Sequence, residues 1–265
     1  MKRNLIAVLC FLVSLATASC SKSVFFNGKP VTESRSIGHF SAISMFNNVN
    51  VTLVESDRPH LELTCPENLI DNITTELSPT GDTLIIKNEN KFNWLRSYDY
   101  SIDLTVYFDS LREINFASNG NLVCTDSLRG IKCLQTDTII DGNDTTYQES
   151  FPKMFNLNIH EGSGDIDLTV NSEVVKCSFG NGTSLATLRG VSSYTEINMR
   201  SYGAVHAEEL VSNFVRVQSF STNDAYVWAK TGLRAWLYSI GNVYYKGNPA
   251  VTPECYSDGR VIKMQ

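Results

Sequence analysis

Paired carboxylates are the groups in this sequence whose spacing comes closest to a catalytic arrangement. Asp165 and Asp167 are two residues apart, and Glu208 and Glu209 are adjacent. Alternate residues of a strand share one face, and two carboxyl groups roughly 5–10 Å apart can hydrolyse a sugar bond between them. One pair offers too few oxygen atoms to bind calcium. Because the chain is acidic, with 28 Asp and Glu against 22 Lys and Arg, such pairs are typical of solvated strands, which is the interpretation we favour.

The other groups that could do chemistry do not form a recognisable site. The four histidines, His39, His60, His160 and His206, are scattered without metal-ligand spacing. The chain contains neither a Gly-x-Ser-x-Gly elbow nor a phosphate-binding glycine loop. We therefore predict no catalytic residues, no metal site and no cofactor. A net charge of −6 without a basic patch argues against nucleic acid as a partner.

Aromatic residues near the C-terminus recur at equal positions of a sequence repeat. Equal positions on neighbouring strands lie about 4.8 Å apart, so their rings would stack into ladders. Such ladders stabilise a fold by about 0.5–1.5 kcal/mol per ring pair beyond area burial. If the rings are exposed, they could instead bind sugar rings or a protein partner. The predicted surface consists of Phe220, Tyr238 and Tyr256 at one position, Tyr226 and Tyr244 at a second, and Trp228 nearby.

The repeat itself runs through the second half of the chain. Its centres, each a Gly or Asn among polar residues, are residues 120, 142, 164, 181, 203, 223, 241 and 259. Because Gly and Asn tolerate a positive φ, we expect a bend at each centre. The residue that opens each strong copy is expected to face inward: Phe116, His160, Met199, Leu237 and Cys255. A unit of about twenty residues with short strands and bends predicts an all-β solenoid of stacked coils, with a β-sandwich as the alternative.

The first half also has the alternation of half-buried strands. Apolar and polar residues alternate over 49–53, 61–64 and 102–106. Residues 66–71 predict one helical turn, because proline is tolerated at its start. The longest insertion, residues 87–100, contains Trp94 and Arg96 and is the first place to expect a cleft.

The N-terminus predicts export and a lipid anchor. Two basic residues precede an apolar run over 5–15, which is too short to cross a membrane and marks residues 1–19 as a signal peptide. Small residues then lead to Cys20, as in bacterial lipoprotein signals, where the cysteine is acylated. Each acyl CH₂ buried in the membrane stabilises the anchor by about 0.8 kcal/mol. Residues 20–36 would link the lipid to the fold, and the outer membrane, on its periplasmic side or at the cell surface, is the expected location.

Five further cysteines are widely spaced and include no C-x-x-C pair. The envelope permits disulfides, but we predict that these residues are small buried hydrophobes. They are Cys65, Cys124, Cys133, Cys177 and Cys255.

Several motifs resemble the "putative auto-transporter adhesin, head GIN domain" lipoproteins, which are abundant in Bacteroidetes. Residues 118–121, 162–165 and 239–242 match their repeated Ser-Gly-Ala-Gly-Asp-like units, and residues 244–249 match their closing Tyr-Tyr-Lys-Gly-Asn-Pro. Residues 40–43 resemble the family's opening. The resemblance covers about residues 36–265 and implies a right-handed β-solenoid in the cell envelope with no established reaction.

Together these observations predict a lipid-anchored envelope protein that acts as an adhesin or as another binding or structural module without catalytic activity. Its domain would comprise an N-terminal β region over 37–115 and a repeat β-solenoid over 116–265. The expected partners are the membrane, through the lipid, and a polysaccharide or an envelope or host protein. The alternative is a glycoside hydrolase or lyase built on a β-helix.

Overall fold

The computed structural model describes residues 28–91, 100–141, 144–200 and 202–265. Apart from one 3-10 helix, η1 (Ile70–Asn72), the described elements are strands, which form one 18-stranded sheet and one two-stranded sheet. The predicted all-β class is therefore confirmed. The described residues contain no helix that is both long and apolar enough to cross a bilayer. The signal peptide, Cys20, Trp94 and Arg96 lie outside the described residues.

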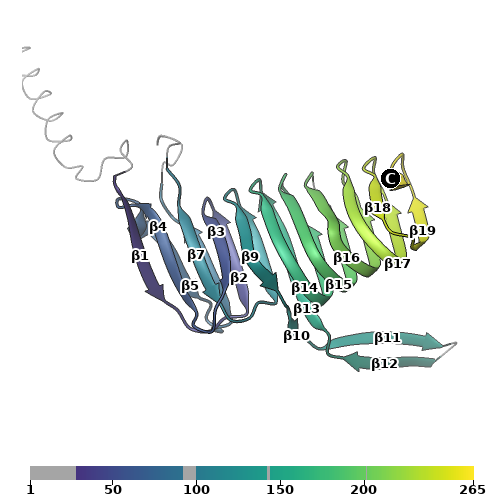
Figure 1. Cartoon of the computed structure of the whole chain (residues 1–265), viewed down its shortest axis with the longest axis horizontal. Helices are drawn as coiled ribbons and strands as arrows, with labels where there is room; N and C mark the ends of the chain where they lie inside the picture. The colour runs from purple at the N-terminus through teal and green to yellow at the C-terminus, as the bar shows by residue number, and fades with distance from the viewer. Residues whose placement is uncertain (1–27, 92–99, 142–143, 201) are drawn as a thin grey trace, which may run out of the picture.

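The C-terminal stack, as we call residues 153–263, is built from parallel strands that follow one another along the chain (Figure 1). Ile166 pairs with Ala186 and Val205 pairs with Ala225, so equal positions are twenty residues apart (186 − 166 and 225 − 205). The strands are β13 (Lys153–Gly162), β14 (Ile166–Phe179), β15 (Leu185–Met199), β16 (Ala204–Ser219), β17 (Ala225–Leu237), β18 (Val243–Lys246), β19 (Ala250–Cys255) and β20 (Val261–Lys263).

The strands before the C-terminal stack also pair in parallel, but not in chain order. β2 (Ala42–Asn47) lies between β6 (Thr83–Asn88) and β8 (Glu113–Ser118). Likewise, β3 (Asn50–Glu55) lies between β7 (Asp103–Phe108) and β9 (Leu122–Leu128). The first strands along the chain are thus inserted between later ones. The predicted boundary between residues 115 and 116 falls inside β8.

The N-terminal cap, as we call β1, β4, η1 and β5, closes the other end of the sheet. β1 (Pro30–Ser36) pairs antiparallel with β4 (His60–Pro66), β4 pairs antiparallel with β7, and β5 (Ile73–Leu77) pairs antiparallel with β6. Residues 30–36 were expected in the linker, and this part of the prediction is wrong. As an edge strand with mostly exposed side chains, β1 lacks the apolar alternation of a half-buried strand. The predicted helical turn is a turn followed by η1.

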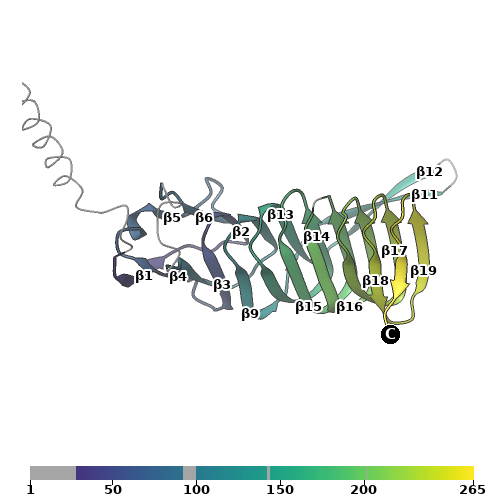
Figure 2. The same ribbon diagram turned by 90° about the horizontal axis from the view of Figure 1, so that it is seen from above.

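A hairpin interrupts the regular repeat after β10 (Ile131–Lys132). β11 (Gln135–Asp141) and β12 (Asp144–Ser150) pair only with each other and project away from the stack (Figures 1 and 2). β13 instead pairs directly with β8 and β10. The expected coil centred on residue 142 is therefore absent: residue 142 lies outside the described residues, and the strands on both sides of it leave the stack. The spacing of Gly and Asn alone could not distinguish a hairpin turn from a coil.

The repeat glycines are required for close approach between strands rather than for positive φ. Gly120, Gly164, Gly241 and Gly259 all lack a positive φ, contrary to our expectation. A Cβ at Gly164 would overlap the carbonyl oxygen of Gly120, and one at Gly241 would overlap that of Asn223. The repeat centre expected at residue 181 lies instead near residue 184. The N–H of Ala204 donates to the carbonyl of Ser184 at 3.2 Å, so Ser184, rather than residue 181, lies beside the centre at Gly203.

The predicted alternation is confirmed in the core. Val51, Leu53, Leu61, Leu104 and Val106 are all buried. Of the residues expected to face inward, Phe116, Met199 and Leu237 are buried.

Two residues expected to face inward are exposed, so that part of the prediction is wrong. A bulge after Ile159 places this residue, not His160, beside Phe116. Cys255 ends β19, which among the described strands pairs with β17 alone and is therefore exposed at the end of the stack.

Three of the five cysteines are buried, as predicted: Cys65, Cys124 and Cys177. Burial raises the pKa of the Cys177 thiol to about 12, which makes it unreactive. Cys133 is only half-buried and Cys255 is exposed, so the prediction is wrong for these two. All five are free thiols.

Candidate functional site

The aromatic ladder, as we call Phe220, Tyr238 and Tyr256, lies along one corner of the C-terminal stack. Each residue directly follows the end of a strand, and each backbone N–H donates to the preceding layer, as from Tyr238 to Ser219 and from Tyr256 to Leu237 at 2.8 Å. The ring centroids are 4.4 and 4.8 Å apart, with interplanar angles of 5° and 4°. The predicted stacking of these three rings is confirmed.

The aromatic ladder is exposed, which a binding surface requires. The exposed fractions are 46% for Phe220, 38% for Tyr238 and 62% for Tyr256. The Tyr256 hydroxyl donates to Glu254 at 2.9 Å, and this hydrogen bond raises the pKa of the phenol and fixes the last ring. Ile240 is also exposed, in the turn after Tyr238. Sequence reasoning missed Ile240 because it is not part of the aromatic repeat.

The other predicted aromatic residues lie on a different face and are half-buried. Tyr226 stacks on Tyr244 with centroids 5.1 Å apart, and His206 extends this row at 4.6 Å from Tyr226. The Nζ of Lys246 lies 5.7 Å from the ring centroid of Trp228. Burial raises the pKa of the Tyr226 phenol. This row is therefore better suited to packing than to contact with a ligand. The contribution of His206 was missed, although it stands twenty residues before Tyr226.

The carboxylate pairs do not converge into a catalytic arrangement. Arg189 lies between the two pairs and forms ion pairs with Asp167 and with Glu209, the latter at 3.1 Å. The backbone N–H of Asp165 donates to the Asn121 side chain at a corner. Glu208 contacts the Nδ1 of His206 at 3.2 Å. Asp167 and Glu209 are thus paired with a cation along a strand face, as expected for a solvated surface.

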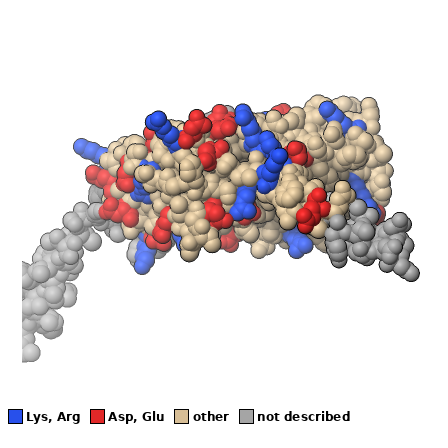
Figure 3. All heavy atoms as spheres, turned by 90° about the horizontal axis from the view of Figure 1, so that it is seen from below, with Lys and Arg blue, Asp and Glu red and all other residues tan. Residues whose placement is uncertain are grey.

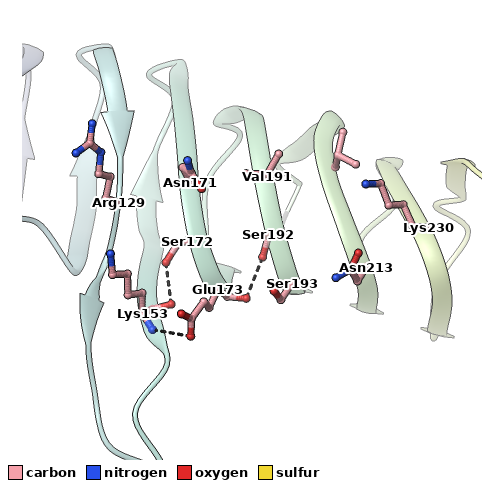
Figure 4. Close-up of a pocket in the computed structure, with 11 residues that line it drawn as sticks. Arg129, Lys153, Asn171, Ser172, Glu173, Val191, Ser192, Ser193, Asn213 and Lys230 are labelled. Atoms are coloured by element: carbon pink, nitrogen blue, oxygen red, sulfur yellow. Dashed lines mark hydrogen bonds between the residues drawn. The ribbon is translucent and has the colours of Figure 1, made fainter.

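A polar groove of about 450 Å³ crosses five strands at another corner (Figure 4). Ser172 donates to the Lys153 carbonyl at 2.8 Å, and Glu173 accepts from the Lys153 backbone N–H at 3.2 Å. Ser172 and Glu173 therefore stabilise the backbone at this corner through hydrogen bonds to Lys153. The remaining charged groups of the groove are cationic: the side chains of Arg129, Lys153 and Lys230.

Three further hollows have volumes of about 360, 550 and 430 Å³, all on the face formed by β13–β17 and β19. Two of them contain Glu196 as their single carboxylate, and the third contains none. None of these four concavities is lined by two carboxyl groups. Among the side chains that the structure describes, no three His, Cys, Asp or Glu converge as a metal site.

The surface seen from below carries charges of both signs side by side, and uncharged side chains dominate toward the C-terminal end (Figure 3). Large exposed apolar residues gather in the same part of the sequence: Tyr202, Phe214, Phe220, Tyr238, Ile240 and Tyr256. The C-terminal stack is therefore the region best suited to contact a partner.

The profile of the "putative auto-transporter adhesin, head GIN domain" family matches residues 39–249. The chain belongs to this family. The resemblance inferred from the motifs is confirmed. A search of curated proteins found no match.

Solved structures from Bacteroides and Parabacteroides species share the fold of this head GIN protein. A putative adhesin from Bacteroides fragilis is 15% identical, with a TM-score of 0.73, covering 91% of this chain and 100% of its own. A putative adhesin from Parabacteroides merdae is 17% identical (TM-score 0.61; 91% and 99% covered). A putative lipid binding protein from Parabacteroides distasonis is 18% identical (TM-score 0.65; 91% and 99% covered). At such identities the likeness shows the fold alone.

The structure explains why this head GIN protein repeats Gly followed by Asn or Asp. The glycine lets the backbones of neighbouring layers approach, as described for Gly164 and Gly241. The next side chain then accepts a backbone N–H from the neighbouring layer, as Asn121 does from Asp165 at 3.0 Å and Asn242 from Arg260 at 2.9 Å. The motif therefore holds neighbouring layers together, and its polar side chains already accept hydrogen bonds from the backbone of the next layer.

Proposed function

We propose that this protein is a binding module of the bacterial cell envelope that holds a polysaccharide, or a protein of the envelope or host, against the exposed aromatic ladder. The module is a right-handed β-solenoid anchored in the outer membrane by lipid on Cys20, and it has no catalytic role. The observation that carries the proposal is the exposure of three parallel, stacked rings in a row. Side chains that served packing alone would be more deeply buried, whereas a contiguous row of exposed aromatic residues is typical of an interaction site.

Two features support the solenoid. Equal positions pair at steps of about twenty residues through four consecutive long strands. Side chains of one kind stack at the corners, as in the aromatic ladder. In a sandwich, strands have no reason to share matched positions over so many layers.

The adhesin names of the family and of two structural relatives support a role outside the cytoplasm. The N-terminal sequence, with small residues before Cys20, supports the lipid anchor. Labelling of growing cells with an alkyne fatty acid tests the anchor. We expect label on the wild-type chain and none on Cys20→Ala, and protease treatment of intact cells then tells the cell surface from the periplasmic side.

The competing function, hydrolysis or lysis of a polysaccharide, has less support. Catalysis of glycoside hydrolysis uses two carboxyl groups that face one bond. The four concavities contain at most one carboxylate each, and the acids at 167 and 209 are bound by Arg189.

A panel of host and bacterial glycans tests binding by the aromatic ladder. We expect the mature chain, with Cys20→Ser to prevent lipidation, to bind at least one glycan. Replacing Tyr238 and Tyr256 by Ala should reduce its retention at least tenfold. Tyr107→Ala is the matched control, since Tyr107 stacks on His60 with centroids 3.9 Å apart on a distant strand.

Equal retention of the wild type and the ladder variant would rule out the ladder as the binding surface. If no glycan binds but crosslinking in cells recovers defined protein neighbours through the ladder, the partner is a protein. Shortening of the glycan during incubation would favour the enzyme.

A further inference from the structure

A second feature of the C-terminal stack, separate from the aromatic ladder, has the chemistry of a ligand site. It is the hollow of about 550 Å³ on the outer face of β15, β16, β17 and β19. We call it the arginine hollow. Its walls include Tyr194, Phe214, Arg216, Gly232, Arg234 and Trp236.

Two guanidinium groups share one indole in the arginine hollow. Arg216 and Arg234 are direct partners on the adjacent parallel strands β16 and β17. Their guanidinium carbons lie 4.9 and 4.4 Å from the ring centroid of Trp236. Like charges directly opposite each other across strands destabilise a sheet. Cation–π contacts with Trp236 offset part of this repulsion, but they leave the hydrogen-bonding edges of both groups to find other partners.

The protein itself satisfies these edges only in part. Arg234 reaches Glu254 at 3.3 Å, whereas the nearest carboxylate oxygen to Arg216 is that of Glu196 at 3.9 Å, beyond hydrogen-bond distance. The Nε of Arg216 is buried and has no hydrogen-bond partner, while the same side chain also forms a hydrogen bond with the Tyr194 hydroxyl. Glu254 is held at the rim by Tyr256, Arg234 and Trp236, which lower its pKa and keep it ionised.

The charge of the arginine hollow is opposite to that of the whole protein. Two cations and no carboxylate line it, although the chain carries a net charge of −6. The side chains of Arg216 and Arg234 are 44% and 58% exposed, so a ligand can reach them. Both acidic neighbours, Glu254 beside Arg234 and Glu196 beside Arg216, lie outside this lining, so the charged groups that face into the hollow are the two guanidinium groups.

The rest of the lining is apolar and shaped. The Phe214 ring is 51% exposed and lies over Gly232, where an added Cβ would come within 2.8 Å of the ring. Gly232 and then Ala250 continue the row of outward side chains that Tyr194 and Phe214 begin. The floor is therefore formed by the Phe214 ring, which covers Gly232, and by the small side chain of Ala250 beside it.

We propose that the arginine hollow binds a sugar unit that carries a carboxylate, within an acidic polysaccharide. The carboxylate accepts N–H bonds from Arg216 and Arg234, which present the planar fork that suits it. The C–H face of the sugar packs on the Phe214 ring and on Ala250 beside it. A small inorganic anion would leave the aromatic wall unused, and a neutral sugar would make no use of the two adjacent guanidinium groups.

Binding of polygalacturonate to the mature chain tests the proposal, with the fully methyl-esterified polymer as the matched neutral probe. We expect calorimetry to show binding of the acid form only, with weakening as salt is raised. Arg216→Gln and Arg234→Gln should each weaken binding about tenfold or more. Arg216→Lys keeps the charge but lacks the planar fork, so its affinity should fall between that of the wild type and that of Arg216→Gln.

Arg260→Gln is the control, since Arg260 is exposed at a corner outside the hollow. Ala250→Phe keeps both arginines but fills the floor, and it should also weaken binding. Melting temperatures of all variants establish that they fold. The proposal is overturned if the acid polymer does not bind, if both polymers bind equally, or if the arginine variants bind like Arg260→Gln. Loss of binding in the Tyr238 and Tyr256 variant alone also overturns it, because the aromatic ladder would then be the site.

Discussion

The N-terminal cap and the C-terminal stack use the same kind of residue, apolar side chains alternating along strands, to build different structures. In the stack, each strand pairs with the next along the chain at steps of about twenty residues. Around the cap, β2 pairs with β8 across 71 residues (113 − 42), and β1, β4 and β5 run antiparallel to their partners. Local pairing can repeat, whereas the N-terminal end is closed by strands that break the repeat.

The buried side chains of the two regions differ in size. The cap and its neighbours bury large aliphatic side chains, such as Leu61, Leu63, Leu69 and Ile73. The last layers of the stack bury several alanines instead: Ala186, Ala207, Ala225, Ala229 and Ala235. All of these residues belong to one continuous hydrophobic core, whose opposite walls can approach more closely where the buried side chains are small.

The sharpest test of close stacking is Gly164→Ala in the C-terminal stack. The added methyl group would overlap the backbone of Gly120, which cannot move without separating two layers. We expect a loss of about 1–3 kcal/mol in the free energy of unfolding, towards the upper value, measured by urea denaturation. Gly180→Ala is the control, since its nearest contact is 3.2 Å and its φ is not positive. Equal stability of both variants would contradict the role assigned to the repeat glycines.

Replacement of Pro253 tests how the uncapped end avoids self-association. β19 pairs with β17 alone, and the N–H of Tyr256 points to β17. Backbone groups alternate in direction, so position 253 faces away and proline removes a donor from the free edge. We expect Pro253→Thr to raise the dimer fraction severalfold, measured by light scattering after gel filtration. Ala250→Thr is the control, and an unchanged monomer in both would show that another feature protects this edge.

The smallest expected effect concerns the turn before β6, which is held by an acid. Asp82 accepts hydrogen bonds from Thr80 at 2.7 Å, Thr83 at 3.0 Å and Ser78 at 3.1 Å, and these bonds lower its pKa. A lowered pKa gives stability that is present above the ordinary aspartate value and is lost as pH falls through the lowered value.

We therefore expect Asp82→Asn to be slightly less stable than wild type in urea at pH 7 and equal to it near pH 2. Asn242→Ala removes a corner amide of the C-terminal stack and should have the same effect at both pH values. A pH-independent difference for Asp82→Asn would show that the turn depends on shape rather than on charge.

Much of the fold could be predicted because it depends on neighbours in sequence. Alternation located the strands at 49–53, 61–64 and 102–106, and equal repeat positions located the stacking of Phe220, Tyr238 and Tyr256. The errors arose where the chain leaves its repeat. A bulge displaced His160, a hairpin replaced the coil at residue 142, and an edge strand looked like a linker at 30–36.

The candidate site was predicted only in part. The six aromatic residues divide between an exposed ladder and a half-buried row, which the sequence could not show, because exposure depends on which face each corner presents. The arginine hollow was missed entirely. Arg216 and Arg234 are eighteen residues apart (234 − 216), and only the pairing of β16 with β17 brings both to Trp236.

By itself, the sequence determined the all-β class, the inward and outward faces of most strands, the repeat near twenty residues and the rings that stack, because each follows from alternation or from residues at equal positions. Only the tertiary structure decided that β2 and β3 are inserted between later strands and that antiparallel strands close one end. It also decided that the hairpin projects from the stack and that two arginines contact one indole. These features depend on which distant backbones satisfy each other's hydrogen bonds, and that choice is made by the whole sheet rather than by any local pattern.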